Sequence, residues 1–191
     1  MCGRYTVTKK KSKIEKKFDV KSDQDFIENY IVLIKHPLSS EVDAAGEQME
    51  TALNSLEKFC HKHSFQVVCI PPNSDPGSHK MNLAIENYAD ADWLIKTETL
   101  SRLQFVNLMR NALALVGNSS MGILEAPHYK LPVVNIGNRQ QGRLNAGNVE
   151  FVPYEIDAIA GALEKAVLNE QYREKIKNLE IFLMVFYRKI F

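Results

Sequence analysis

The stretch ALALVGNSSMG, residues 112–122, joins a short apolar segment directly to a loop of Gly, Asn and Ser. Apolar runs of this length predict buried strands, and the serines predict the start of a helix. Further apolar segments lie at residues 30–35, 65–70, 93–97, 132–137 and 149–152. Strands that are apolar throughout and alternate with helices are typical of a parallel sheet covered on both faces. We therefore expect a Rossmann-like three-layer α/β/α domain with about six mostly parallel strands.

Helical spacing fills the intervals between these strands. Apolar residues recur at every third or fourth position, which marks the buried face of a helix. Ser39 or Ser40 is placed to cap a helix that starts at Glu41. The predicted helices span residues 41–60, 78–88, 101–112, 122–129 and 162–179, the last with a break near Asn169.

The composition is that of an ordinary globular protein. The 191 residues are 45% apolar and 25% charged, with a formal net charge of +1. A chain of this length corresponds to one domain with a modest extension, or to a small two-domain protein at most. Because nucleic-acid-binding proteins carry a pronounced basic excess, the net charge argues against a nucleic-acid partner for the chain as a whole.

The cysteines and the hydropathy of the sequence indicate the cellular compartment of the protein. The three cysteines have no CxxC spacing and their number is odd, so we expect no disulfide framework and a reducing compartment. The longest apolar run is the seven residues from Ile181 to Tyr187, whereas a membrane-spanning helix needs about 20. The N-terminus does not resemble a secretory signal. These features predict a cytoplasmic protein with no membrane partner.

Composition divides the chain into three parts. Residues 1–28 are polar and rich in lysine, with Asp and Glu interspersed, which predicts a solvated helix or linker in preference to an arm for an anionic partner. Residues 29–179 hold the predicted strands and helices and form the domain. Residues 180–191 are an apolar, aromatic-rich tail, which we expect to lie against an apolar surface.

Polar residues follow four of the predicted strands. In a parallel sheet, ligands bind outside the carboxyl ends of the strands. The candidates at these ends are His36, Asn73, Asp75, Ser119, Ser120, Arg139 and Arg143. The sequence therefore predicts a ligand site at this edge of the sheet.

The loop from Gly117 to Gly122 is the strongest single indication of a ligand. Glycine lets a backbone approach closely and a helix start offers N–H groups, so phosphate is a natural guest. A serine-capped helix without a ligand explains the loop alone about equally well. Arg139 and Arg143, after the next strand, favour an anion site because guanidinium groups bind phosphate through two hydrogen bonds.

The sequence of this loop excludes two known kinds of site and offers one further ligand-binding residue. It carries no GKS or GKT, so it is not a Walker loop. Its G-x-S-S-x-G spacing is one residue longer than that of a nucleophile elbow. Glu125, three residues after Gly122, is placed to accept hydrogen bonds from ribose hydroxyls or to complement the helix dipole, and these two interpretations are compatible.

The sequence contains no cluster of His, Cys, Asp and Glu with the spacing of a metal site. His61 and His63 form a His-x-His, but helical spacing points the two side chains apart, so we do not expect a zinc site. No metal and no cofactor is expected.

Four motifs, in this order along the chain, resemble the UDP-N-acetylglucosamine 2-epimerases, and within them the hydrolysing branch. They are His-Pro after the first strand, Pro-Asn-Ser-Asp after the second, Gly-Asn-Ser-Ser-x-Gly-x-x-Glu-Ala after the fourth and Asn-x-Gly-x-Arg-Gln-x-Gly-Arg after the fifth. The resemblance covers about residues 13–168. It implies the C-terminal half of a GT-B fold, in which two Rossmann-like halves enclose the active site. It also implies UDP contacts at His36, Asn73, Ser119, Ser120, Glu125 and Arg139, with Arg143 as a neighbour.

The resemblance implies a reaction as well. The family eliminates UDP from UDP-N-acetylglucosamine to give a 2-acetamidoglucal, then adds water, which yields N-acetylmannosamine for sialic-acid-type sugars. It places His36 near the reacting sugar, where it assists the departure of UDP. The carboxylates that move the protons come largely from the N-terminal half in the family. The expected partner is therefore that half or a second copy of the chain, and the isolated chain is expected to be inactive.

Two departures from the family pattern bear on this prediction. Leu124 stands where many members have Arg, and the tail from residue 180 replaces a commoner Asn-Pro-Tyr-Gly-Asp-Gly type segment. The alternatives are a non-catalytic UDP-sugar-binding module and the C-terminal half of a GT-B glycosyltransferase.

Overall fold

The apolar segments pair into a fully parallel sheet with the strand order β3-β2-β1-β4-β5-β6. The structure, a computed structural model, describes residues 29–98 and 100–179. The strands are β1 (Tyr30–Ile34), β2 (Gln66–Ile70), β3 (Leu94–Lys96), β4 (Leu115–Gly117), β5 (Val133–Ile136) and β6 (Val149–Val152). The Rossmann-like architecture is confirmed, whereas the predictions for residues 1–28 and 180–191 lie outside the described residues.

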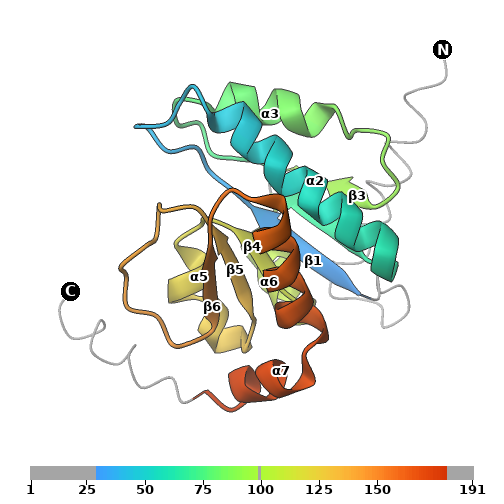
Figure 1. The fold of residues 1–191 in the computed structure, drawn as a ribbon, viewed down its shortest axis with the longest axis vertical. Helices are drawn as coiled ribbons and strands as arrows, with labels where there is room; N and C mark the ends of the chain where they lie inside the picture. The colour runs from blue at the N-terminus through green and yellow to red at the C-terminus, as the bar shows by residue number, and fades with distance from the viewer. Residues whose placement is uncertain (1–28, 99, 180–191) are drawn as a thin grey trace.

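Helices cover both faces of this sheet (Figure 1). One layer holds α2 (Ala45–His63), α3 (Ser78–Glu86) and α6 (Ile156–Leu168), which is followed by α7 (Glu170–Lys177). The other layer holds α4 (Arg102–Asn111), α5 (Met121–Leu124) and the 3-10 helix η1 (Ala126–Tyr129). Strand residues alternate between the two cores, so Leu33 packs beneath α2 and Ile34 packs on the opposite face. No helix in the described part of the chain is long and apolar enough to cross a membrane.

The strand order reverses between β1 and β4, which places the switch point of the sheet at their carboxyl ends. Ile34 and Gly117 are paired there. Gly117 has a φ of +132°, and a Cβ at this position would lie 2.0 Å from the Ile34 carbonyl oxygen. Only glycine allows the two strand ends to approach this closely.

Helix α2 begins at Ala45, so the prediction of a helix starting at Glu41 with a serine cap was wrong. Two consecutive turns come first, in which Glu41 N–H donates to Leu38 and Ala44 N–H donates to Glu41. Ala44 occupies the N-cap position, and no side chain caps the helix. The intervening turns leave the Glu41 carboxylate beside the sheet, where it bonds Gln48.

Two other helices differ from the prediction in their bounds. The helix expected over 122–129 is one turn, α5, followed by η1, in which Pro127 lies in the first turn. The helix expected over 162–179 begins six residues earlier, at Ile156. The predicted break at Asn169 is confirmed, since its side chain accepts from Tyr172 N–H and caps α7.

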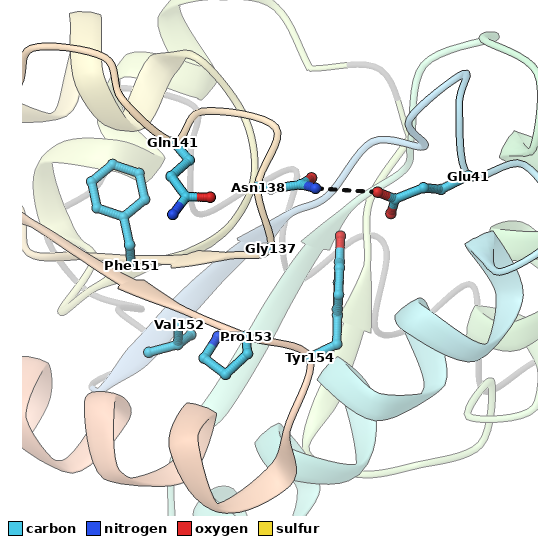
Figure 2. A pocket seen from close by; sticks show the side chains of 8 residues that line it. All are labelled: Glu41, Gly137, Asn138, Gln141, Phe151, Val152, Pro153 and Tyr154. Carbon is cyan, nitrogen blue, oxygen red and sulfur yellow. Dashed lines mark hydrogen bonds between the residues drawn. The ribbon is translucent and has the colours of Figure 1, made fainter.

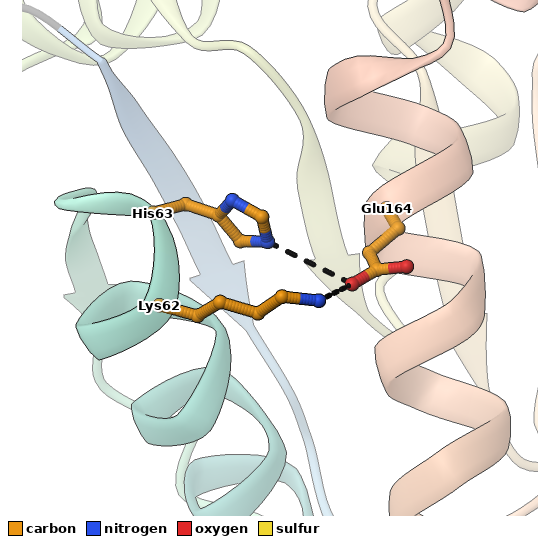
Figure 3. Close-up of polar contacts among 3 residues, drawn as sticks. All are labelled: Lys62, His63 and Glu164. Atoms are coloured by element: carbon orange, nitrogen blue, oxygen red, sulfur yellow. Dashed lines mark hydrogen bonds and ion pairs between the residues drawn. The ribbon is translucent and has the colours of Figure 1, made fainter.

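An ion pair joins the end of α2 to α6 (Figure 3). Lys62 Nζ lies 2.6 Å from Glu164 Oε1, and His63 Nε2 lies 3.7 Å from the same oxygen. Because Lys62 and Glu164 are largely exposed, the pair adds little to the stability of the fold.

Candidate functional site

Asn118, the buried residue directly after β4, joins the carboxyl ends of three strands. Its Oδ1 accepts from His36 N–H at 2.7 Å, and its Nδ2 donates to the His36 carbonyl at 2.8 Å. Its own carbonyl accepts from Arg139 Nη1 at 3.2 Å and from Gln140 Nε2 at 3.1 Å. The segments after β1, β4 and β5 are therefore held in one arrangement at the switch point.

The imidazole of His36 is half-buried at the same edge. Its Nδ1 accepts from the backbone N–H of Asn73 at 3.2 Å, and the Asn73 side chain donates to Asp75. Burial lowers the pKa of His36, as does Arg139, while Asp75 opposes them. The ring is therefore neutral near pH 7, and because Nδ1 is an acceptor its proton lies on Nε2. Nε2 is then a hydrogen-bond donor for a bound group.

The serine loop offers further donors. Ser119 Oγ accepts from Met121 N–H at 3.4 Å. The N–H groups of Ser119 and Ser120 donate to no acceptor within the described residues, and both residues are only half-buried. Because α5 is a single turn, its dipole attracts an anion less strongly than the dipole of a longer helix does. The capacity to bind an anion lies instead in these N–H groups, the hydroxyls and Arg139.

The structure brings together five of the seven residues predicted to contact UDP. His36, Asn73, Ser119, Ser120 and Arg139 lie at the carboxyl edge, on the segments joined by the contacts above. Glu125 is exposed at the end of α5, and Arg143 is exposed on the loop after β5. Neither takes part in the bonds described above, so their predicted roles stay predictions.

A second polar group beside His36 was not predicted from the sequence. Lys35 is fully buried, and its Nζ contacts Gln48 Oε1 at 3.4 Å and lies 5.0 Å from the centre of the Tyr154 ring. A lysine that ends an otherwise apolar strand is the one feature that could have indicated it. Next to this group is a pocket of about 390 Å³ at the ends of β5 and β6 (Figure 2). It is lined by Glu41, Gly137, Asn138, Gln141, Phe151, Val152, Pro153 and Tyr154.

The arrangement suits recognition of an anion with adjoining polar groups. Arg139 supplies a fixed positive charge, the serine loop supplies N–H and hydroxyl donors, and His36 supplies a donor from a neutral ring. Donors held in place before an anion arrives stabilise charge without reorganising.

Known proteins are similar to this chain in sequence. A family model described as UDP-N-acetylglucosamine 2-epimerase matches residues 4–183. A UDP-N,N'-diacetylbacillosamine 2-epimerase (hydrolyzing) of Legionella pneumophila is 35% identical over 136 residues, which are 71% of this chain and 35% of that protein. A GDP/UDP-N,N'-diacetylbacillosamine 2-epimerase (hydrolyzing) of Campylobacter jejuni is 30% identical over 157 residues, 81% of this chain and 38% of that protein. The chain thus spans little more than a third of these relatives' length.

The fold also matches solved structures. A UDP-GlcNAc 2-epimerase from Neisseria meningitidis, solved with UDP-GlcNAc bound, superposes with a TM-score of 0.68 at 21% identity. The match covers 92% of this chain and 45% of that one. At this identity the likeness shows the fold alone, which is the Rossmann-like half of a GT-B arrangement.

Proposed function

The chain belongs to the UDP-N-acetylglucosamine 2-epimerase family, and we propose that it holds the nucleotide of a UDP-2-acetamido sugar for a hydrolysing 2-epimerase. The observation that carries this proposal is the joining of His36 and Arg139 through Asn118. Beside them lie the N–H groups of Ser119 and Ser120, which donate to no acceptor among residues 29–98 and 100–179. A diphosphate matches this set, because it offers several oxygen acceptors and negative charge over a short distance.

Each residue has a distinct role in the proposed complex. Arg139 and the serine-loop N–H groups bind the diphosphate, and Asn73 contacts the nucleotide from the loop after β2. His36 donates from Nε2 to an oxygen of the leaving diphosphate. Glu125 accepts from the ribose hydroxyls, and Arg143 is a neighbour of the phosphates.

The proposed reaction has two stages. A carboxylate removes the C2 proton of the sugar, the electron pair forms the C1=C2 double bond, and the C1–O bond breaks to release UDP. Water then adds across that bond, with its oxygen at C1 and a proton at the opposite face of C2, which gives the free 2-epimeric sugar. This chain contributes to the first stage by stabilising the charge that develops on the diphosphate.

The proton-transfer groups belong, in this proposal, to a second Rossmann-like half. The second candidate is a module that binds UDP-sugars without turning them over. The odd cysteine number supports a cytoplasmic location for either.

We propose UDP-N-acetylglucosamine as the substrate and N-acetylmannosamine as the product, in the formation of sialic-acid-type amino sugars. Two relatives are named for UDP-N,N'-diacetylbacillosamine, which carries a second acetamido group. Assays with both sugar nucleotides separate these possibilities, because the better substrate releases UDP with the larger kcat/KM.

The test combines binding and turnover. We expect the chain alone to bind UDP but to release no N-acetylmannosamine from UDP-N-acetylglucosamine, and to gain turnover when the N-terminal half of a relative is added. His36→Ala should abolish that turnover, whereas His61→Ala, at the exposed end of α2, should not. Turnover by the chain alone at about 1 s⁻¹ or more would contradict the assignment of the base to another half. Restored activity that survives His36→Ala would contradict the role of His36.

A further inference from the structure

Lys35 carries a buried amine that the proposed reaction does not use. It follows the last residue of β1 and precedes His36, and its side chain is 0% exposed. Its Nζ donates to Gln48 Oε1 at 3.4 Å and lies 5.0 Å from the Tyr154 ring centre. A purely structural position of this kind favours an apolar side chain such as Met, because burying a charge is costly.

Hydrogen bonds connect Lys35 to the anion site. Gln48 Nε2 donates to Glu41 Oε2 at 2.6 Å, and Glu41 Oε1 accepts from Asn138 Nδ2 at 3.3 Å. Asn138 directly precedes Arg139. Figure 2 shows the Asn138–Glu41 bond next to the Tyr154 hydroxyl. The chain of contacts therefore runs from the buried ammonium group to the arginine that faces the proposed diphosphate.

The charges of the two groups beside Lys35 cancel, so protonation of Lys35 leaves a net positive charge. Glu41, before α2, is negative, Arg139, after β5, is positive, and Lys35 itself adds the third charge. The neighbouring rings of His36 and Tyr154 are neutral near pH 7. The pKa of Lys35 is lowered to about 7, chiefly by burial, while Glu41 raises it and Arg139 lowers it. An anion bound to Arg139 offsets the repulsion between the two cations and favours the protonated form of Lys35.

We propose that Lys35 is a positioning residue that takes up a proton when a nucleoside diphosphate binds, so that its charge is added to the anion site only in the complex. This inference rests on the proposed function. Lys35 does not touch the ligand in this proposal, since it is fully buried, and it acts through Gln48, Glu41 and the Asn138–Arg139 segment.

Calorimetric titration of the full chain with UDP tests the proposal. Titrations above about pH 7 avoid the phosphate groups, which ionise near pH 6, and His36, which is neutral there. Heats measured in two buffers of different ionisation enthalpy give the number of protons taken up. We expect uptake of a fraction of a proton by the wild type at pH ~7.5, and none by Lys35→Met. Affinity should fall by about fourfold between pH ~7 and pH ~8.5 if binding raises the pKa by about 1.

The outcomes separate this inference from the proposed function. Lys80→Met removes an exposed lysine paired with Asp43 and should leave proton uptake unchanged. UDP binding without proton uptake, or equal uptake by Lys35→Met, would overturn the role of Lys35 alone. Absence of any UDP binding would overturn the proposed function and this inference together. If Lys35→Met fails to fold, the buffer dependence of the wild type still decides.

Discussion

The side chain of Asn118 forms two hydrogen bonds with the backbone of His36, accepting one from its N–H at 2.7 Å and donating one to its carbonyl at 2.8 Å. The two residues are 82 positions apart in the sequence and follow adjacent strands. An amide side chain is suited to this contact because it offers one acceptor and one donor in a plane. The Asn118 side chain thereby extends the contact between the two segments beyond the last pair of the strands, Ile34 and Gly117. It fixes the backbone of His36, which carries the imidazole.

Removing this contact should destabilise the fold. Asn118→Ala leaves the His36 N–H and carbonyl without partners in a part-buried position, and we expect the free energy of unfolding to fall by about 2 kcal/mol. Urea denaturation measures the change. Asn111→Ala, at the exposed end of α4, should change stability by less than about 0.5 kcal/mol. Equal effects of the two substitutions would show that the Asn118 contacts contribute nothing.

Two glycines should respond oppositely to alanine. At Gly117 the φ is +132° and a Cβ would lie 2.0 Å from the Ile34 oxygen, so the backbone would have to shift. We expect Gly117→Ala to cost more than about 3 kcal/mol. Gly161 lies in α6, where a Cβ would meet nothing within 4 Å, so Gly161→Ala should stabilise the chain by about 0.5–1 kcal/mol. Thermal unfolding of both variants checks the pair, and a stable Gly117→Ala would contradict the close approach of β1 and β4.

Replacing Arg139 should weaken the binding of UDP more than the binding of uridine. Arg139→Ala removes a charge-assisted contact, so we expect UDP binding to weaken by roughly 1.5–3 kcal/mol and uridine binding to change much less. Calorimetry with both ligands measures the difference. Arg110→Ala, on the exposed end of α4, serves as the matched control and should affect neither ligand. Equal losses for UDP and uridine would show that Arg139 does not meet the phosphates.

The burial of Lys35 should appear in the pH dependence of stability. Its pKa is about 7 in the folded chain, against 10.5 ordinarily, so between these values the unfolded chain binds more protons and stability rises with pH. Lys35→Met should be more stable than the wild type near pH 7, by on the order of 2 kcal/mol. The difference should shrink by up to about 1.4 kcal/mol per pH unit above the folded pKa.

Urea denaturation of both proteins between about pH 7 and pH 9 measures this difference, and Lys80→Met provides the control for loss of an exposed lysine. A constant difference across the range would contradict a lowered pKa at Lys35. A more stable variant that binds UDP less well would show that the buried lysine is retained for binding.

The sheet and the edge that carries the site could be predicted from the sequence. Runs such as residues 30–35 and 132–137 are apolar throughout, and this pattern reports burial on both faces. Because the sheet is parallel, the residues after each strand meet at one edge, and the structure places His36, Ser119 and Arg139 there.

Contacts between distant segments could not be predicted in the same way. Nothing local marks Asn118 as the partner of His36, since the contact depends on the register of β1 and β4. Likewise, Glu41 was predicted to start a helix, but the turns after Leu38 delay the helix to Ala45 and free the carboxylate for Gln48 and Asn138. The contacts of Lys35 form only when the fold brings Gln48 of α2 and Tyr154, which follows β6, to the end of β1.

The central claim is that a nucleoside diphosphate binds at the carboxyl edge of the sheet, and a titration of the ¹⁵N-labelled chain with UDP, followed by amide chemical shifts, tests it most directly. We predict saturable shifts that cluster at His36, Asn73, Ser119, Ser120 and Arg139, with little change at the opposite edge around Asn29 and Gly147. Absence of saturable shifts, or shifts centred on the opposite edge, would contradict the account.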